Sequence, residues 1–137
     1  MKRNGGQVYN LEFKIIDLTL MVLAKVAFPA LAQRPSLNVY FQSTLEDAAY
    51  QKAVFAKASA AWKAPKVLPA VGKKAVVQAI VAKDGKVTSS HVSMSSGSKA
   101  WDDAALAAVK SASPYAPLPS GYRYPTLEVH FHVALVP

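Results

Sequence analysis

The chain has 137 residues, a length that fits one domain with a modest core rather than two domains. Its 16 lysine and arginine residues outnumber its 8 aspartate and glutamate residues, which favours acidic partners, but the positive charges are scattered and form no stripe of the kind that tracks nucleic-acid phosphates. The absence of cysteine excludes disulfides and thiolate sites.

Residues 1–32 have the parts of a secretory leader, because basic residues precede an apolar run that ends in small residues at Ala32. Asp17 and Lys25 interrupt this run, so it falls short of the roughly 20 apolar residues of a comfortable bilayer span. We expect a signal peptide that is cleaved after Ala32, and an uncleaved weak membrane anchor is the alternative. In both cases the rest of the chain would lie outside the cytoplasm.

Residues 33–44 contain several loop-forming residues, among them Pro35, Ser36 and Asn38. They are predicted to be a short connector, which spans at most about 40 Å when extended. Residues 45–137 are predicted to form the one folded domain.

The first helix of that domain is predicted to begin at a capping pattern, either Ser43 with Glu46 or Thr44 with Asp47. Pro65 ends it. Large apolar residues recur every four positions and form one packing face, namely Tyr50, Val54, Ala58 and Trp62.

Two strands, residues 75–82 and 87–94, are predicted to form a hairpin. The pair Asp84-Gly85 between them is typical of a two-residue type I′ turn, which needs positive φ at both central residues.

A second helix is predicted between Ser98, which can cap it, and Pro114, which ends it. Asp102 and Asp103 lie in its first turns. We interpret these carboxylates as stabilising the helix start through its dipole, rather than as a catalytic pair.

The closing stretch, residues 126–135, alternates apolar and polar side chains and is predicted to be the last strand. The apolar side, expected to pack under the helices, consists of Leu127, Val129, Phe131, Val133 and Leu135. The polar side carries Glu128, His130 and His132. A zinc or copper site on these three residues is conceivable, but it would lack a fourth ligand and supporting hydrogen-bond partners, so we expect no bound metal.

The order of these elements resembles the C-terminal domain of the TonB/TolA family of Gram-negative envelope proteins, and in particular its TolA-like branch. The residues that carry the resemblance run from Tyr50 to Leu135. They include the segments VVQAIVAKDGKV, VSMSSG, WDDAALAAVKSASP and PLP.

The resemblance implies an α+β fold in the order α-β-β-α-β, with a small three-stranded antiparallel sheet and two helices packed on one face. It implies a periplasmic domain that binds envelope proteins, either an outer-membrane transporter or a Tol-type partner, and that contributes to energy transduction or transport across the envelope. The last strand would lie at the sheet edge and accept a partner segment by β-strand addition. The binding residues would be Thr126, Leu127, Glu128, Val129, His130, Phe131, His132 and Val133.

Other functions stay open or are disfavoured. A secreted basic protein that binds lipopolysaccharide or peptidoglycan is the alternative, and the short connector leaves docking without transduction as an option. The sequence has no Gly-rich phosphate loop and no G-x-S-x-G motif, so we expect no enzyme, no catalytic residue and no cofactor. Nucleic acid is not an expected partner, membrane contact would come only through an uncleaved leader, and an edge strand could also pair with its own copy in a homodimer.

Overall fold

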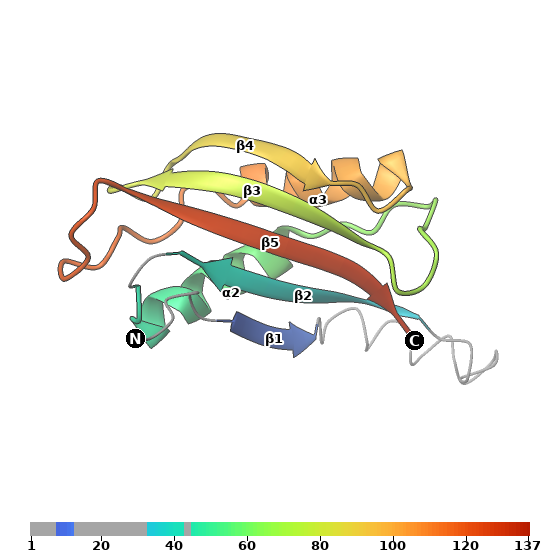
Figure 1. Cartoon of the computed structure of the whole chain (residues 1–137), viewed down its shortest axis with the longest axis horizontal. Coiled ribbons are helices and arrows are strands. Elements are labelled where there is room, and N and C mark those ends of the chain that lie inside the picture. The colour runs from blue at the N-terminus through green and yellow to red at the C-terminus, as the bar shows by residue number, and fades with distance from the viewer. Residues whose placement is uncertain (1–7, 13–32, 43–44) are drawn as a thin grey trace.

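The computed structural model describes residues 8–12, 33–42 and 45–137. Within them it has five strands and two helices in the order β1 (Val8–Glu12), β2 (Arg34–Phe41), α2 (Ala48–Ala61), β3 (Lys74–Ala82), β4 (Val87–Met94), α3 (Lys99–Ser111) and β5 (Thr126–Val136). The strands form one sheet in the order β1-β2-β5-β3-β4, and every neighbouring pair is antiparallel. Both helices lie on the same face of this sheet (Figure 1).

The predicted α+β class, both helices and the strands β3, β4 and β5 are confirmed. The predicted number of three strands is wrong, because β2 and β1 extend the sheet to five. Strand β2 consists of residues that were expected to be a connector. Its apolar residues alternate with polar ones, and Leu37, Val39 and Phe41 are all buried.

The expected leader, residues 1–32, lies outside the described residues except for Val8–Glu12, which form β1 and pair with β2. Neither of the two helices in the described ranges is long and apolar enough to cross a membrane.

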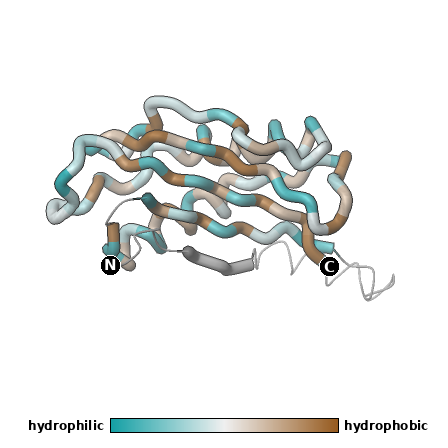
Figure 2. Tube along the Cα trace, in the orientation of Figure 1, coloured by the Kyte–Doolittle hydropathy of each residue, from teal (hydrophilic) through white to brown (hydrophobic). Residues whose placement is uncertain are grey.

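The core lies between the helices and one face of the sheet. Figure 2 shows apolar residues alternating with polar ones along the strands, which is the pattern of a sheet with one buried face. From the helices, the predicted stripe is buried as expected, and Trp62 packs edge-on against Trp101 with ring centroids 4.9 Å apart. The fully buried sheet residues include Val77, Val81, Leu127, Val129 and Phe131.

The turn between β3 and β4 differs from the predicted two-residue turn. Ala82 donates its N–H to the Lys86 carbonyl at 2.8 Å, and Gly85 donates to the Ala82 carbonyl at 2.8 Å, so three residues form the loop. Gly85 has φ +93°, a left-handed conformation that favours glycine. A Cβ at Gly85 would lie 2.0 Å from the carbonyl oxygen of Tyr115, so the turn is also packed against the loop after α3.

The two helix starts are capped by side chains. Asp47 accepts a hydrogen bond from Tyr50 N–H at 2.9 Å and caps α2, whereas Ser43 and Thr44 lie outside the described residues. Ser98 accepts from Trp101 N–H at 3.2 Å and caps α3 as predicted.

Candidate partner-docking site

Strand β5 lies inside the sheet, so its predicted position at the edge is wrong. On one side it pairs with β3, from Lys74 opposite Ala134 to Ala82 opposite Thr126. On the other side it pairs with β2, from Arg34 opposite Val136 to Phe41 opposite Val129. Most of the main chain of the predicted binding residues is therefore already paired within the monomer (Figure 1).

The side chains of β2 explain why it occupies this flank. Leu37 is 2% exposed, and Val39 and Phe41 are 0% exposed. Complete burial stabilises by about 1.5–3 kcal/mol for each such side chain, or about 5–9 kcal/mol for the three. A whole domain is stable by only about 5–15 kcal/mol. Removing β2 would therefore cost a large share of the stability of the fold, unless an incoming strand supplied similar side chains.

The predicted binding residues divide between the two faces of the sheet. Four of them, Leu127, Val129, Phe131 and Val133, are buried in the core. Thr126 is exposed, and the other three are partly buried on the face away from the helices, namely Glu128, His130 and His132.

This second face carries a small polar cluster. A carboxylate oxygen of Glu128 lies 2.8 Å from Nε2 of His130, and the side-chain amide of Gln78 donates a hydrogen bond to the same carboxylate. The ring of His132 packs against Tyr40 with centroids 4.4 Å apart. Within the described ranges no three potential ligands come together in a group that could hold a metal ion.

The environment of His132 keeps its ring neutral near pH 7. Burial, together with the positive charges of Lys74 and His130, lowers the pKa of His132 from 6.5 to about 4. Its Nδ1 is buried and has no hydrogen-bond partner among the described residues.

The sheet has two outer strands in the described part of the chain, β1 and β4. Each pairs with one neighbour only, β1 with β2 and β4 with β3, so each leaves one row of backbone N–H and C=O groups unpaired by the sheet. Sequence reasoning placed β4 beside β3 correctly but did not identify it as the open edge.

Strand β4 has few of the features that protect an edge strand. Its sequence, VTSSHVSM, contains no Lys, Arg, Asp, Glu or Pro. Register irregularities occur near both of its ends, and between them the pairing is regular from Val92 opposite Val77 to Ser89 opposite Ile80. The central residues 89–92 therefore present a regular edge without Lys, Arg, Asp, Glu or Pro, to which a further strand can be added.

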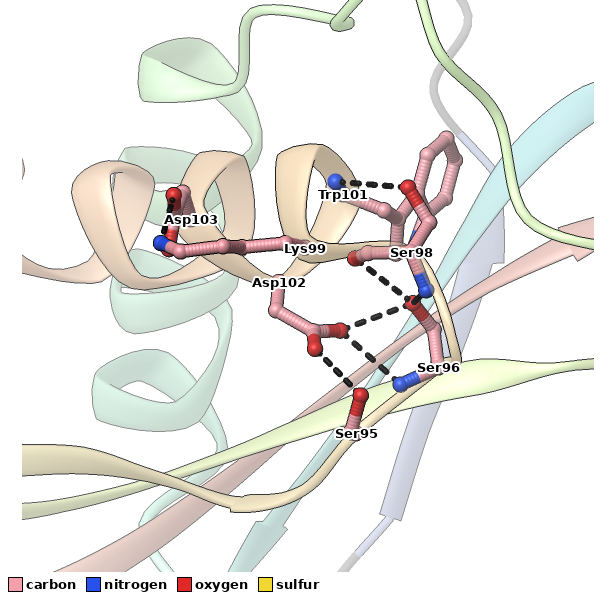
Figure 3. Close-up of polar contacts among 7 residues, drawn as sticks. All are labelled: Ser95, Ser96, Ser98, Lys99, Trp101, Asp102 and Asp103. Carbon is pink, nitrogen blue, oxygen red and sulfur yellow. Dashed lines mark hydrogen bonds and ion pairs between the residues drawn. The ribbon is translucent and has the colours of Figure 1, made fainter.

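The turn that follows β4 is held by Asp102 of α3 (Figure 3). Asp102 is buried and accepts hydrogen bonds from Ser96 N–H at 2.8 Å and from the hydroxyl groups of Ser96 and Ser95 at 2.7 and 2.5 Å. Burial raises the pKa of this carboxyl group, but the hydrogen bonds from Ser95 and Ser96 together outweigh burial, and the net pKa is lowered. Asp102 therefore has two roles: it holds the turn that follows β4 through hydrogen bonds, and it provides a negative charge in the first turn of α3.

Asp103, the neighbouring carboxylate, is exposed and forms a 2.8 Å ion pair with Lys99. The two carboxylates thus have separate structural partners. The sequence signal for the role of Asp102 is the Ser95-Ser96-Gly97-Ser98 run just before it, which offers hydroxyl donors to a nearby carboxylate.

These elements define a class of protein: a small α+β domain with helices on one face of an antiparallel sheet and an open strand at its edge. A family model described as TonB C terminal matches residues 47–132. The match covers more than half of the chain, and the chain belongs to this family. Neither the search among curated proteins nor that among solved structures gives a match.

The matched range has a structural consequence. It contains α2, β3, β4, α3 and most of β5, but it ends short of β1 and β2 on the N-terminal side. The strand that covers the flank of β5 therefore comes from outside the family-matched unit, whereas the open strand β4 belongs to it.

Proposed function

We propose that this chain is a periplasmic partner-binding domain of TonB type, which docks an envelope protein by β-strand addition. Family membership supports the binding role. The observation that carries the mode of binding is the outer edge of β4, which is unpaired within the described residues and carries no Lys, Arg, Asp or Glu. An outer-membrane transporter or a Tol-type protein is the proposed partner.

The partner segment is proposed to pair with β4 at residues 89–92. Pairing there uses backbone groups that the sheet leaves open and requires no rearrangement of the core. Among the described residues the outer edge of β1 is also unpaired, but β1 lies outside the family-matched range. Direct pairing of a partner with Thr126–Val133 stays a prediction, and it requires β2 to leave.

The proposal is confined to docking. Residues 34–41, which were expected to belong to the short connector, form strand β2 of the sheet. Any contribution to energy transduction would therefore have to be transmitted through residues other than this segment.

The experiment is a titration of ¹⁵N-labelled protein with extended peptides from candidate envelope partners, with amide shifts and hydrogen exchange recorded for each residue. We expect the largest changes in residues 89–92, and new protection at every second amide, because alternate N–H groups of an edge strand point outward. Changes confined to other surfaces would contradict docking at β4. Strong salt dependence without selectivity among peptides would instead favour binding of anionic envelope polymers.

A matched pair of variants sharpens this test. Of Ser89→Pro and Ser90→Pro, one removes a donor to β3 and the other removes an outward donor, because successive N–H groups alternate in direction. The variant that loses only the outward N–H is expected to fold, since edge strands accept proline there. That folded variant should lose partner binding, and unchanged affinity in it would refute the proposal.

A further inference from the structure

A groove of about 590 Å³ lies at the end of the sheet where β4 finishes. One wall is the loop that leads into β3, and the other is the turn from β4 into the start of α3. Val67 and Leu68 line the first wall and are unusually exposed for apolar residues, at 62% and 45%. Exposed apolar side chains that line a concave surface are typical of an interaction site.

Hydrogen bonds hold both walls in place. The hydroxyl of Ser98 donates to the carbonyl of Val67 at 3.3 Å, which joins the two walls directly. Gly72 N–H donates to the Leu135 carbonyl at 2.8 Å and ties the loop to β5. Asp102 holds the opposite turn through Ser95 and Ser96. The groove is thus preformed, which lowers the ordering cost of binding.

The two charged side chains that line the groove, Lys73 and Lys99, are both positive. The loop and the first residue of β3, residues 63–74, contain four lysines and no acidic residue. Lys73 lines one wall and Lys99 the other. The partial positive charge at the start of α3 is offset by the buried carboxylate of Asp102 in its first turn, so the lysine side chains provide the positive charge. Asp103 pairs with Lys99, but the two side chains are 60% and 87% exposed, so water and salt screen this pair.

We propose that this groove, termed the β4-end groove and lined by Val67, Leu68, Lys73 and Lys99 among others, binds an acidic and apolar segment of a partner protein. The apolar wall takes aliphatic side chains, while the lysines on the two walls attract carboxylates. An anionic membrane surface shares part of this chemistry. The second wall makes the site concave, and a concave site fits an inserted peptide side chain better than a planar bilayer.

The position of the groove links it to the proposed function. Strand β4 ends at Met94, which is 53% exposed, and Ser96 in the groove wall follows two residues later. A partner strand added to β4 would therefore run toward the groove. In this placement the inference rests on the proposed function, because the groove would bind the partner residues that flank the strand added to β4.

The test uses the full chain and two short probes, an acetylated and amidated Glu-Leu-Glu-Leu-Glu peptide and its Lys-Leu-Lys-Leu-Lys counterpart. In a ¹⁵N titration at low ionic strength, we expect the acidic peptide to shift the amides of Gly72, Gly97 and Lys99. The basic peptide should shift none of them. Absence of these shifts, or equal shifts with both peptides, would overturn the proposal.

Variants provide the second measurement. Lys73→Glu combined with Lys99→Glu should weaken binding of the acidic peptide by about tenfold at low salt, since two exposed charge contacts change sign. Lys52→Glu, at an exposed position of α2 outside the groove, is the control and should leave the affinity unchanged. Equal affinity in the double variant and in the control would contradict the groove assignment.

Two further experiments distinguish peptide binding in the groove from membrane binding and from strand docking at β4. Phosphatidylglycerol vesicles that bind the protein and displace the peptide would overturn the peptide assignment in favour of a membrane surface. The folded proline variant of β4 should still bind the short acidic peptide but should no longer bind the partner segment. Loss of binding to both would contradict a groove site that is separate from the β4 edge. Partner docking at β4 without any groove shift would overturn the groove alone.

Discussion

The strand β2 should contribute several kcal/mol to stability, and Phe41→Ala tests this contribution. Phe41 is 0% exposed and packs edge-on against Tyr50 at 6.3 Å between centroids. Truncation of a buried phenylalanine to alanine costs about 3–5 kcal/mol, as lost burial plus the cavity that remains. With a urea dependence of about 1–3 kcal/mol/M for a domain of this size, the midpoint should fall by about 2 M.

Urea unfolding followed by tryptophan fluorescence is the assay, because Trp62 and Trp101 both lie in the core. Val39→Ala, at an equally buried position, should cost about 2 kcal/mol and provides a milder variant if Phe41→Ala does not fold. Tyr40→Ala is the matched control on the opposite face, where its partly exposed ring contacts His132, and it should cost about 1 kcal/mol. If Phe41→Ala and Val39→Ala both unfold at the wild-type urea midpoint within experimental error, the assignment of β2 to the core is refuted. The original prediction of a connector at residues 33–44 would then be supported.

Three further predictions concern single residues. Gly85→Ala should destabilise the fold by about 2–4 kcal/mol in urea unfolding, because it combines a left-handed φ with a contact to the Tyr115 carbonyl; a neutral effect would mean that the turn is free of the loop. Asp102→Asn should lower the free energy of unfolding by about 1–3 kcal/mol, because buried donors of Ser96 lose one of their carboxylate acceptors, whereas Asp103→Asn should change it by no more than about 0.5 kcal/mol. Equal effects of the two substitutions would contradict the assignment of Asp102 as the residue that holds the turn after β4. Because the pKa of His132 is lowered to about 4, the unfolded chain binds a proton below about pH 6.5 that the folded chain does not, so stability should fall as the pH drops from 6.5 to 4. His132→Phe should lose this component in thermal unfolding measured across that range, and an unchanged pH dependence would contradict the shift.

Much of the fold could be predicted from local pattern. The alternation in residues 126–135 and the four-residue spacing from Tyr50 to Trp62 each report which face of an element is buried. The same kind of signal was present in β2, where Leu37, Val39 and Phe41 alternate with polar residues. This alternation was interpreted as a connector because the segment also contains residue types that are common in loops, namely Pro35, Ser36 and Asn38.

The position of the docking edge could not be predicted in the same way. Alternation in β5 shows which side chains are buried, but it carries no information on which strands pair with its two flanks. That arrangement depends on β2, which is distant in sequence: Phe41 pairs with Val129, 88 residues later (129 − 41). It also depends on the burial of β2 in the same core. The groove likewise joins residues 67–73 and 96–100, which no local motif connects.

Docking of a partner at β4, with β2 kept in the sheet, can be tested by hydrogen exchange at single amides in the free and partner-bound protein. We expect β2 and β5 to be protected in both states, because each lies between two strands. Partner binding should add protection to alternate amides in residues 89–92 of β4. Loss of protection in β2 upon binding, with β5 protected and β4 unchanged, would show that the partner replaces β2 and would contradict docking at β4.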